Sequence, residues 1–359
     1  MGLDPAFWSG RKVLLTGHSG FKGAWAALWL RELGARVTGY ALAPPTVPNL
    51  FELARVEDSL TSVFSDIRDL TALRRVMAEA QPEIVIHMAA QSLVRRSYRN
   101  PIETYEVNAL GTAYLLESIR TCQSVRVAVI VTSDKCYENR ESLAPYRESE
   151  PLGGHDPYAS SKACAELIAA AYRSSFFCAP GATQVATARA GNVIGGGDWA
   201  EDRLIPDIAR AVLAGRPIEI RNPEAVRPWQ HVLDPIAGYF LLAERLWGRM
   251  PKSAGPWNFG PDEDAMKPVS WIVDHVLSRW GGGTGWEHHR EDQLHEATLL
   301  LLHSSKAREQ LGWQPKLDLE AALNWTVDWY RAYGNGADPC RTTIDQIRRY
   351  SSLLRTVSA

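Results

Sequence analysis

The sequence predicts an α/β fold built around a doubly wound parallel sheet, with a smaller C-terminal α/β domain beside it. Two observations support this fold class. Short, β-branched apolar runs recur through the first 190 residues and alternate with longer helical patterns, which is the rhythm of β-α-β units. A glycine-rich turn also joins the first of these runs to the helix that follows, as in doubly wound folds that bind ligands at the carboxyl ends of their strands.

The apolar runs have the length and composition of buried strands. They are apolar on both faces, which indicates a parallel sheet covered by helices on two sides. The predicted strands span residues 13–17, 35–42, 83–90, 127–133 and 184–190, and the predicted helices span residues 24–33, 70–80, 109–121 and 160–177.

Composition and charge exclude several classes of partner. The 39 basic and 41 acidic residues give a net charge of −2, and no block of like charges offers a surface to nucleic acid or to a membrane. The five cysteines are odd in number and form no C-x-x-C pair, so we expect neither a disulfide framework nor a metal site. We find neither the apolar core of a signal peptide nor a run of about 18 apolar residues. These features predict a cytoplasmic protein.

The first predicted strand leads into T-G-H-S-G-F-K-G, residues 16–23. Its glycines allow a tight turn, and the helix N-terminus that follows presents unpaired N–H groups to a pyrophosphate. This pattern predicts a Rossmann-type dinucleotide site. The cofactor-binding residues predicted in this loop are Gly17, Ser19, Gly20, Phe21, Lys22 and Gly23. Lys22 stands where an apolar residue is expected, and it either neutralises a phosphate or points to solvent.

The adenosine end of the dinucleotide site is less defined. The second strand ends in Gly39 to Leu42 with no Asp or Glu to bind the ribose, so this strand leaves NAD and NADP both open. Asp66 and Ile67, which follow the third strand, are predicted contacts of the adenine ring. Alternatively, Asp66 caps a helix or forms a turn.

After Gly195 the β-α-β rhythm breaks. The segments GGGDW, RNPEAVRPW and GPWNFGP are loop-like, whereas residues 236–247 predict a helix that returns to the first domain. We predict a dinucleotide-binding domain of residues 1–190 plus about 230–257. A second domain of about 191–229 plus 258–335 would lie over the carboxyl ends of the strands. The C-terminal tail, 336–359, is polar, and we assign it little structure.

Polar residues gather where a catalytic centre would lie in this fold. Tyr158 and Lys162 are four residues apart at the start of a helix and therefore share a face. A lysine ammonium beside a phenol is expected to lower the tyrosine pKa, and Lys162 can also donate to the nicotinamide ribose. The strand before them ends in four polar residues, Thr132 to Lys135, as expected of groups that face a ligand. Ser133, Tyr158 and Lys162 together can remove an alcohol proton while hydride leaves the same carbon.

Six segments closely resemble those of the CDP-glucose 4,6-dehydratases, a family of extended short-chain dehydrogenases/reductases. They are TGHSGFKG, HMAAQSLVRRSY, VTSDKCYENRE, PLGGHDPYASSK, RAGNVIGGGDWAEDRLIPD and RNPEAVRPWQHVLDP, and the resemblance spans about residues 7–335. It implies an NAD-dependent lyase of deoxysugar biosynthesis that converts CDP-D-glucose to CDP-4-keto-6-deoxy-D-glucose and water. C4 would be oxidised, water lost from C5 and C6, and hydride returned to C6.

The resemblance also implies roles in the elimination. Tyr158 would take the proton of the 4-hydroxyl. Asp134 would protonate the departing 6-hydroxyl, for which it must itself stay protonated, as burial favours. Lys135 stands where better-known 4,6-dehydratases have Glu. It would act as the C5 base in its neutral form, polarise the ketone or enolate, or simply pair with Asp134.

The remaining residues implied by the resemblance line the two ligands. Ala89, Ala90 and Asn108 match positions that flank the cofactor, although Asn108 could instead be a helix N-cap. The predicted substrate-binding residues, besides Ser133, are Asn192 at the sugar or diphosphate, Arg203, Leu204, Ile205 and Pro206 around the cytosine, and Arg227, His295 and Glu296 at the diphosphate. His295 could equally lie on a surface helix. Trp199 and Trp229 could stack on a ring, but core packing is the simpler expectation.

Two other functions use part of the same residues. A nucleotide-sugar 4-epimerase or ketoreductase needs Ser133, Tyr158 and Lys162 but no group that expels the 6-hydroxyl, so Asp134 and Lys135 favour a dehydratase. A non-catalytic NAD-binding protein would need none of the proton-transfer groups. The resemblance further implies a homodimer or homotetramer, joined through the helices 109–121 and 160–177.

Overall fold

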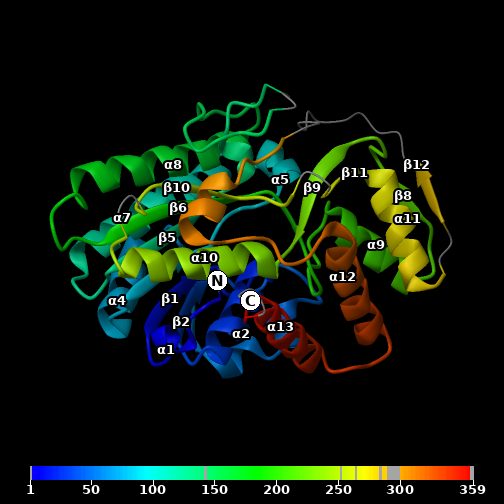
Figure 1. Ribbon diagram of the computed structural model, residues 1–359, viewed down its shortest axis with the longest axis horizontal. Helices are drawn as coiled ribbons and strands as arrows, with labels where there is room; N and C mark the ends of the chain where they lie inside the picture. Colours follow the sequence, from blue (N-terminus) through cyan, green and yellow to red (C-terminus); the bar gives the residue numbers. More distant parts are fainter. Residues whose placement is uncertain are drawn as a thin grey trace.

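The computed structural model describes residues 2–140, 144–250, 253–262, 265–282, 285–288 and 300–355. Its centre is a seven-stranded parallel sheet with the strand order β3-β2-β1-β4-β5-β6-β10, so the predicted doubly wound fold is confirmed (Figure 1). The strands are β1 (Lys12–Thr16), β2 (Arg36–Ala41), β3 (Thr61–Phe64), β4 (Ile84–His87), β5 (Val127–Val131), β6 (Gln184–Ala190) and β10 (Pro256–Phe259).

The sheet grows in two directions from β1. The chain first adds β2 and β3 on one side, and then returns to add β4, β5, β6 and β10 on the other. The loops after β1 and β4 therefore diverge at the carboxyl edge, where folds of this type bind their ligands. Thr16, at the end of β1, joins these two loops because its Oγ1 accepts hydrogen bonds from the N–H groups of Met88 and Ala89, both at 3.1 Å.

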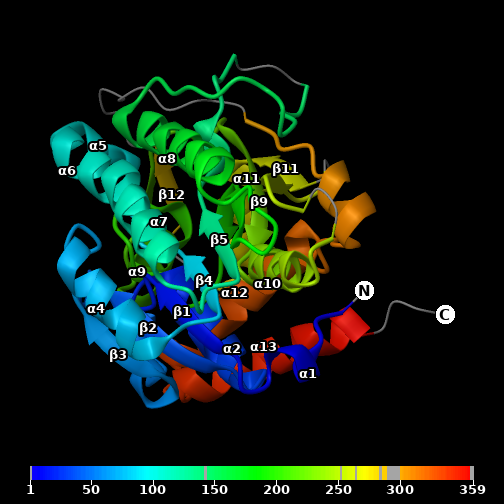
Figure 2. The same cartoon turned by 90° about the vertical axis from the view of Figure 1, so that its left-hand side faces the viewer.

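Successive strand residues point to two buried faces. In β5, Val127, Val129 and Val131 belong to the larger apolar core, whereas Ala128 and Ile130 belong to the core on the opposite face. The first face is covered by α2 (Phe21–Glu32), α10 (Leu233–Trp247) and α13 (Pro339–Arg355), and the second by α4 (Leu70–Ala80), α7 (Gly111–Thr121) and α8 (Pro157–Ser175) (Figure 2). Burial on both faces explains why the strand sequences are apolar throughout.

A second unit lies beyond the carboxyl edge of the sheet, at the right in Figure 1. It contains a three-stranded sheet of β7 (Asn192–Ile194), β9 (Val226–His231) and β11 (Met266–Pro268), a two-stranded sheet of β8 (Ile218–Ile220) and β12 (Trp286–His288), and the helices α9 (Leu204–Leu213), α11 (Val269–Trp280) and α12 (Leu319–Gly334). Two segments predicted to be loops are strands: RNPEAVRPW contributes to β9, and GPWNFGP contains β10 of the main sheet.

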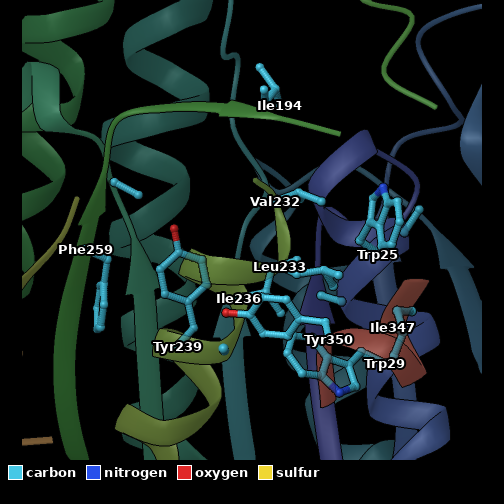
Figure 3. Close-up of a cluster of buried hydrophobic side chains, with 14 of the residues drawn as sticks. Trp25, Trp29, Ile194, Val232, Leu233, Ile236, Tyr239, Phe259, Ile347 and Tyr350 are labelled. Carbon is cyan, nitrogen blue, oxygen red and sulfur yellow. The ribbon is translucent and has the colours of Figure 1, made fainter. Parts of the chain in front are cut away.

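The polar C-terminal tail is also more structured than predicted. Residues 339–355 form α13, which packs beside α2 with Ile344, Ile347, Tyr350 and Leu354 buried. Figure 3 shows Tyr350 next to Trp29 of α2, with their ring centroids 5.5 Å apart. The Tyr350 hydroxyl donates to Asp234 at the start of α10 (2.6 Å).

The predicted helices and strands agree with the structure to within a few residues at their ends. Residues 70–80 and 184–190 match α4 and β6. Helix α8 begins at Pro157, earlier than predicted, because the Asp156 side chain accepts from the N–H of Ala159 (2.8 Å) and so caps it. The short helices are α1 (Pro5–Trp8), α3 (Leu50–Leu53), α5 (Val94–Arg99) and α6 (Pro101–Tyr105). Within the described ranges, every helix is too short or too polar to cross a membrane.

Candidate active site

The loop between β1 and α2 has the geometry of a phosphate-binding turn. Gly17 has a φ of +76°, and a Cβ there would lie 2.7 Å from the backbone nitrogen of Ala89. A Cβ on Gly23 would lie 2.0 Å from the carbonyl oxygen of Gly17, so both positions require glycine. Gly20 is the N-cap of α2, and a Cβ there would meet only the Gly17 oxygen, at 3.5 Å. The N-terminal N–H groups of α2 are thus accessible to an anion, and the loop fits a dinucleotide pyrophosphate.

The side chains of this loop differ in what they contact. Ser19 Oγ donates to the carbonyl of Leu42 (2.7 Å), which ties the loop to the end of β2. The ring of Phe21 lies against Gly195 of the second unit, where an added Cβ would approach it to 3.2 Å. Lys22 Nζ lies 5.8 Å from the ring centroid of Tyr239 on α10.

Lys22 lies within electrostatic reach of two predicted catalytic residues, Lys162 and Asp134. Burial, followed by the charges of Arg203 and Lys162, lowers the pKa of Lys22 to about 7, whereas Asp134 raises it. The two alternatives predicted for Lys22, a phosphate partner or a solvent-facing side chain, therefore did not include this place beside the predicted catalytic residues.

At the adenosine end, the Asp66 side chain is used within the protein. Its carboxylate accepts from the backbone N–H of Arg68 (2.9 Å) and pairs with the Arg68 guanidinium (2.7 Å). These bonds lower the pKa of Asp66 and match the turn alternative. Ile67 is buried, with its side chain close to Gly111 at the start of α7.

Sequence reasoning missed His18, which occupies the space beside the end of β2. A Cβ on Gly39 would lie 2.4 Å from the His18 ring, so glycine at that position admits the imidazole. His18 Nε2 shares a hydrogen bond with Ser62 Oγ (2.7 Å), and the ring stacks on Phe64. Burial lowers the pKa of His18 to about 4, so the ring is neutral at physiological pH.

Asn108 lies in a wide helical turn, Glu106–Leu110, that precedes α7, so it does not cap that helix. Its amide nitrogen donates to the carbonyl of Gln91 (2.9 Å) and to Ser161 Oγ (2.8 Å), and its oxygen accepts from the N–H of Gln91 (2.9 Å). Asn108 therefore fixes the segment after β4, which contains Ala89 and Ala90, to helix α8.

The predicted catalytic residues meet in one buried cluster. Ser133 Oγ donates to Asp134 Oδ1 (2.9 Å) and accepts from the backbone N–H of Lys135 (3.2 Å). The Tyr158 side chain lies close enough to Ser133 for that hydroxyl to lower the pKa of the phenol, against the larger rise from burial. Lys162 Nζ donates to the carbonyl of Val131 at the end of β5 (3.4 Å). The structure thus brings the strand end and the face of α8 together, as the sequence predicted.

The pKa of Tyr158 is raised overall, which is opposite to the shift expected from Lys162. Burial raises the pKa of Tyr158 to about 12, with a smaller rise from Asp134, and only Ser133 and Arg203 lower it. Burial also lowers the pKa of Lys162 to about 8. Desolvation of the phenol outweighs nearby positive charge here, a balance that residue spacing cannot reveal.

The residues predicted to contact the sugar and the cytosine lie on two elements, β7 and the start of α9. Asn192 begins β7 beside the turn Asp134–Cys136, since a Cβ on the preceding Gly191 would lie 3.0 Å from Asp134 Oδ2. Arg203, the N-cap of α9, donates to Asp198 and Ser92 (both 2.9 Å). Leu204 is half-buried, but Ile205 and Pro206 are buried, and the Ile205 side chain packs in the larger apolar core.

Two basic residues oppose each other at the predicted diphosphate end. Arg227 on β9 lies opposite Lys267 on β11 in the register of the two antiparallel strands. Lys267 was not among the residues predicted from the sequence. Like charges facing each other across two strands are unfavourable, and an anion between them would relieve the repulsion. Trp199 packs edge-on against Tyr330 and Tyr333, in agreement with the core expectation. His295 and Glu296 lie outside the described residues. Over the described ranges, no three His, Cys, Asp or Glu side chains group as metal ligands.

Comparison with known proteins identifies the family. A sequence profile described as GDP-mannose 4,6 dehydratase matches residues 14–247. The CDP-glucose 4,6-dehydratase of Salmonella typhimurium is 50% identical over 354 residues, which cover 98% of this chain and 99% of that protein.

Solved structures show the same fold. The UDP-glucose 4-epimerase of Thermotoga maritima with UDP-glucose has a TM-score of 0.78 at 23% identity, covering 89% of this chain and 99% of that one. The UDP-glucose 4-epimerase of Thermus thermophilus in complex with NAD has a TM-score of 0.77 at 25% identity, covering 89% and 98%. The profile match and the half-identical relative of nearly equal length place the chain: it belongs to the GDP-mannose 4,6 dehydratase family.

Proposed function

We propose that the protein is a CDP-glucose 4,6-dehydratase, a lyase that uses NAD to convert CDP-D-glucose to CDP-4-keto-6-deoxy-D-glucose and water. The observation that supports this most strongly is the buried cluster of Ser133, Asp134, Tyr158 and Lys162, next to the glycine loop. The Salmonella relative named CDP-glucose 4,6-dehydratase is 50% identical over nearly the whole length of both chains, which supports CDP as the nucleotide.

The loop from Gly17 to Gly23 would hold the pyrophosphate of NAD, and Lys162 would donate to the nicotinamide ribose. When bound, NAD supplies a hydride acceptor for C4 and afterwards a hydride donor for C6. The chain itself supplies the proton transfers. Ser133 would orient the 4-hydroxyl, and Tyr158 would take its proton. Because burial raises the pKa of Tyr158 to about 12, the rate of C4 oxidation should increase with pH into the alkaline range.

Elimination requires an acid at the 6-hydroxyl and a base at C5. Asp134, which is buried and bonded to Ser133, would be the acid. Lys135 is the base that the family resemblance implies. Lys22 is a second candidate, because its pKa of about 7 makes a neutral amine available near neutral pH. Arg227 and Lys267 would bind the diphosphate, Arg227 through two parallel hydrogen bonds.

Turnover with three glucose nucleotides tests the proposal. Purified protein and NAD are mixed with CDP-, UDP- or dTDP-glucose, and alkali then reveals a 4-keto-6-deoxy product by its enone-type absorbance. We expect that signal with CDP-glucose above the other two. Formation of CDP-galactose would identify an epimerase instead, and no reaction with any nucleotide would indicate a binding protein.

We also propose that the protein works in the cytoplasm as a homodimer or a pair of dimers. Large apolar side chains are exposed on the face that includes α7 and α8: Leu110 is 47%, Leu167 58% and Phe176 51% exposed. Two copies of this face could cover one another as a four-helix interface. Light scattering of the purified protein should give twice or four times the mass of one chain, and a monomer would refute this assembly.

A further inference from the structure

A chain of buried polar residues lies beneath the catalytic turn Asp134–Cys136. It begins with an ion pair between Arg189 on β6 and Glu166 on α8, in which Arg189 Nη2 donates to Glu166 Oε2 (2.8 Å). Both side chains are only 3% exposed. Removing two charges from water is costly, and further hydrogen bonds to both groups offset part of that cost.

The Glu166 carboxylate joins the end of β5 to the middle of β6. It accepts from Thr132 Oγ1 (2.5 Å), the residue before Ser133, and from Thr187 Oγ1 of β6 (2.7 Å). Thr132 was expected to face a ligand, but its hydroxyl bonds to Glu166 inside the protein, which accounts for a polar residue at this position. The bonds to Glu166 also fix the point at which β5 leads into the catalytic turn.

The Arg189 guanidinium continues the chain to the other end of the turn. Its Nη1 donates to the hydroxyl of Tyr137 (2.7 Å), and that hydroxyl donates to Asn258 Oδ1 on β10 (2.7 Å). The guanidinium carbon also lies 4.8 Å from the centroid of the Tyr137 ring. Tyr137 is fully buried, so its side chain is held on every side by the protein.

The turn with Asp134 and Lys135 is therefore fixed on both sides by one network. Thr132, bonded to Glu166, holds the chain before the turn, and Tyr137, bonded to Arg189, holds the chain after it. Tyr158 and Lys162 lie on α8, which also carries Glu166 of this network, whereas Tyr137 lies at the far end of the turn. Loss of the Tyr137 hydroxyl alone should therefore disturb the elimination residues more than Tyr158 and Lys162.

We propose that Tyr137 and Arg189 are positioning residues for the elimination step. This inference rests on the proposed dehydratase function. Neither side chain reaches the reacting atoms, and both act by holding the turn. Without the Tyr137 hydroxyl the turn can shift, which moves Asp134 and Lys135 away from C6 and C5 but leaves Tyr158 at the 4-hydroxyl. A misplacement of about 1 Å can reduce a rate about 100-fold.

The test compares Tyr137→Phe with Tyr146→Phe. Tyr146 is a matched control because it stacks on Tyr137, with centroids 5.1 Å apart, and its hydroxyl bonds only to Asn139 and to the N–H of Arg140 among the residues that the structure describes. Four quantities are measured with CDP-glucose: kcat, the rate of the first NAD reduction in a single turnover, the absorbance of reduced NAD at steady state, and the melting temperature of the protein alone.

For Tyr137→Phe we expect a kcat about 10- to 100-fold lower, an accumulation of reduced NAD, and a first reduction step within about twofold of wild type. Tyr146→Phe should resemble wild type in all three. Arg189→Lys, which keeps the charge beside Glu166 but not the fork of donors, should show the same accumulation as Tyr137→Phe.

Two results would overturn the inference while leaving the proposed function intact. One is an equal loss of reduction and elimination in Tyr137→Phe, which would indicate general damage to the fold. The other is Tyr137→Phe and Tyr146→Phe behaving alike. If wild type makes no 4-keto-6-deoxy product, the proposed function itself fails, and this inference fails with it.

Discussion

The two halves of the sheet's carboxyl edge are built differently. Beside β1 and β2, backbone N–H groups of the glycine loop are available to a ligand, whereas the side chains of Ser19 and Asp66 bond to other groups of the protein. Beside β5 and β6 the side chains themselves face the site, and a buried polar network holds them. A backbone site needs only correctly spaced glycines, whereas a site of reacting side chains needs partners from distant parts of the chain. Four substitution experiments sharpen this contrast.

The largest expected effect is on the side-chain half. Tyr158→Phe should lower kcat by about 1000-fold or more, because the phenol is the base for the 4-hydroxyl. The dissociation constant for NAD should stay within about threefold of wild type, since the backbone half is unchanged. Steady-state kinetics and calorimetric titration with NAD measure the two quantities. Undiminished turnover would remove Tyr158 from the mechanism.

The second prediction separates two lysines within the site. Lys135→Ala should slow elimination by about 100-fold and trap reduced NAD, as loss of a general base would. Lys22→Ala serves as the comparison: if Lys22 is the C5 base, it will trap reduced NAD instead. Absorbance spectra recorded during turnover show in which of the two variants reduced NAD accumulates. Equal loss of oxidation and elimination in Lys135→Ala would show that Lys135 serves only binding or structure.

The third prediction tests the backbone half. Gly23→Ala forces a Cβ to within 2.0 Å of the Gly17 oxygen, so the loop must shift. Strain of about 1–3 kcal/mol should weaken NAD binding about 5- to 150-fold. Gly248→Ala is the control, since its Cβ would find its nearest neighbours at 3.7 Å. Unchanged NAD affinity in Gly23→Ala would contradict the proposed place of the pyrophosphate.

The smallest effect concerns α10, the helix that packs against β5 and β6. Burial raises the pKa of Asp234, at the start of α10, from 3.8 to about 7, against the bond from Tyr350 that lowers it. As the pH rises, the unfolded chain loses the Asp234 proton near pH 4, whereas the folded chain keeps it to about pH 7. The protonated carboxyl therefore stabilises the fold fully below pH 4, and this contribution to the free energy of unfolding is lost as the pH rises to about 7.

The melting temperature of wild type should therefore fall between pH 5 and pH 8, by about 2 °C or more from this group. Asp234→Asn cannot ionise, and its melting temperature should vary less with pH. Thermal melts at several pH values measure this, and parallel curves for the two proteins would show that Asp234 does not titrate in this range.

Local sequence patterns predicted a large part of this molecule. The glycine loop depends on residues within one turn, and Tyr158 and Lys162 depend on helical spacing. Ser133 and Asp134 were found because a buried strand ended in polar residues. Each of these signals lies within a few residues of the feature that it predicts.

The features that the sequence did not reveal depend on distant contacts. The strand β10 is short and contains Asn258, a buried amide whose partners Tyr137, Tyr146 and His303 lie far away in the sequence. The raised pKa of Tyr158 follows from burial by several elements. Helix α13 did give a signal, since Ile344, Ile347 and Leu354 recur at helical spacing, but its charged composition obscured it. The position of Arg189 within an apolar strand was likewise an available signal of its buried ion pair with Glu166.

The central claim is that a hydride leaves C4 and returns to C6 of the same sugar. Conversion of CDP-glucose deuterated at C4 tests it most directly, with the product analysed by nuclear magnetic resonance. The account predicts CDP-4-keto-6-deoxyglucose with the deuterium at C6. Deuterium that remains at C4, or a product in which it is lost to solvent, would contradict it.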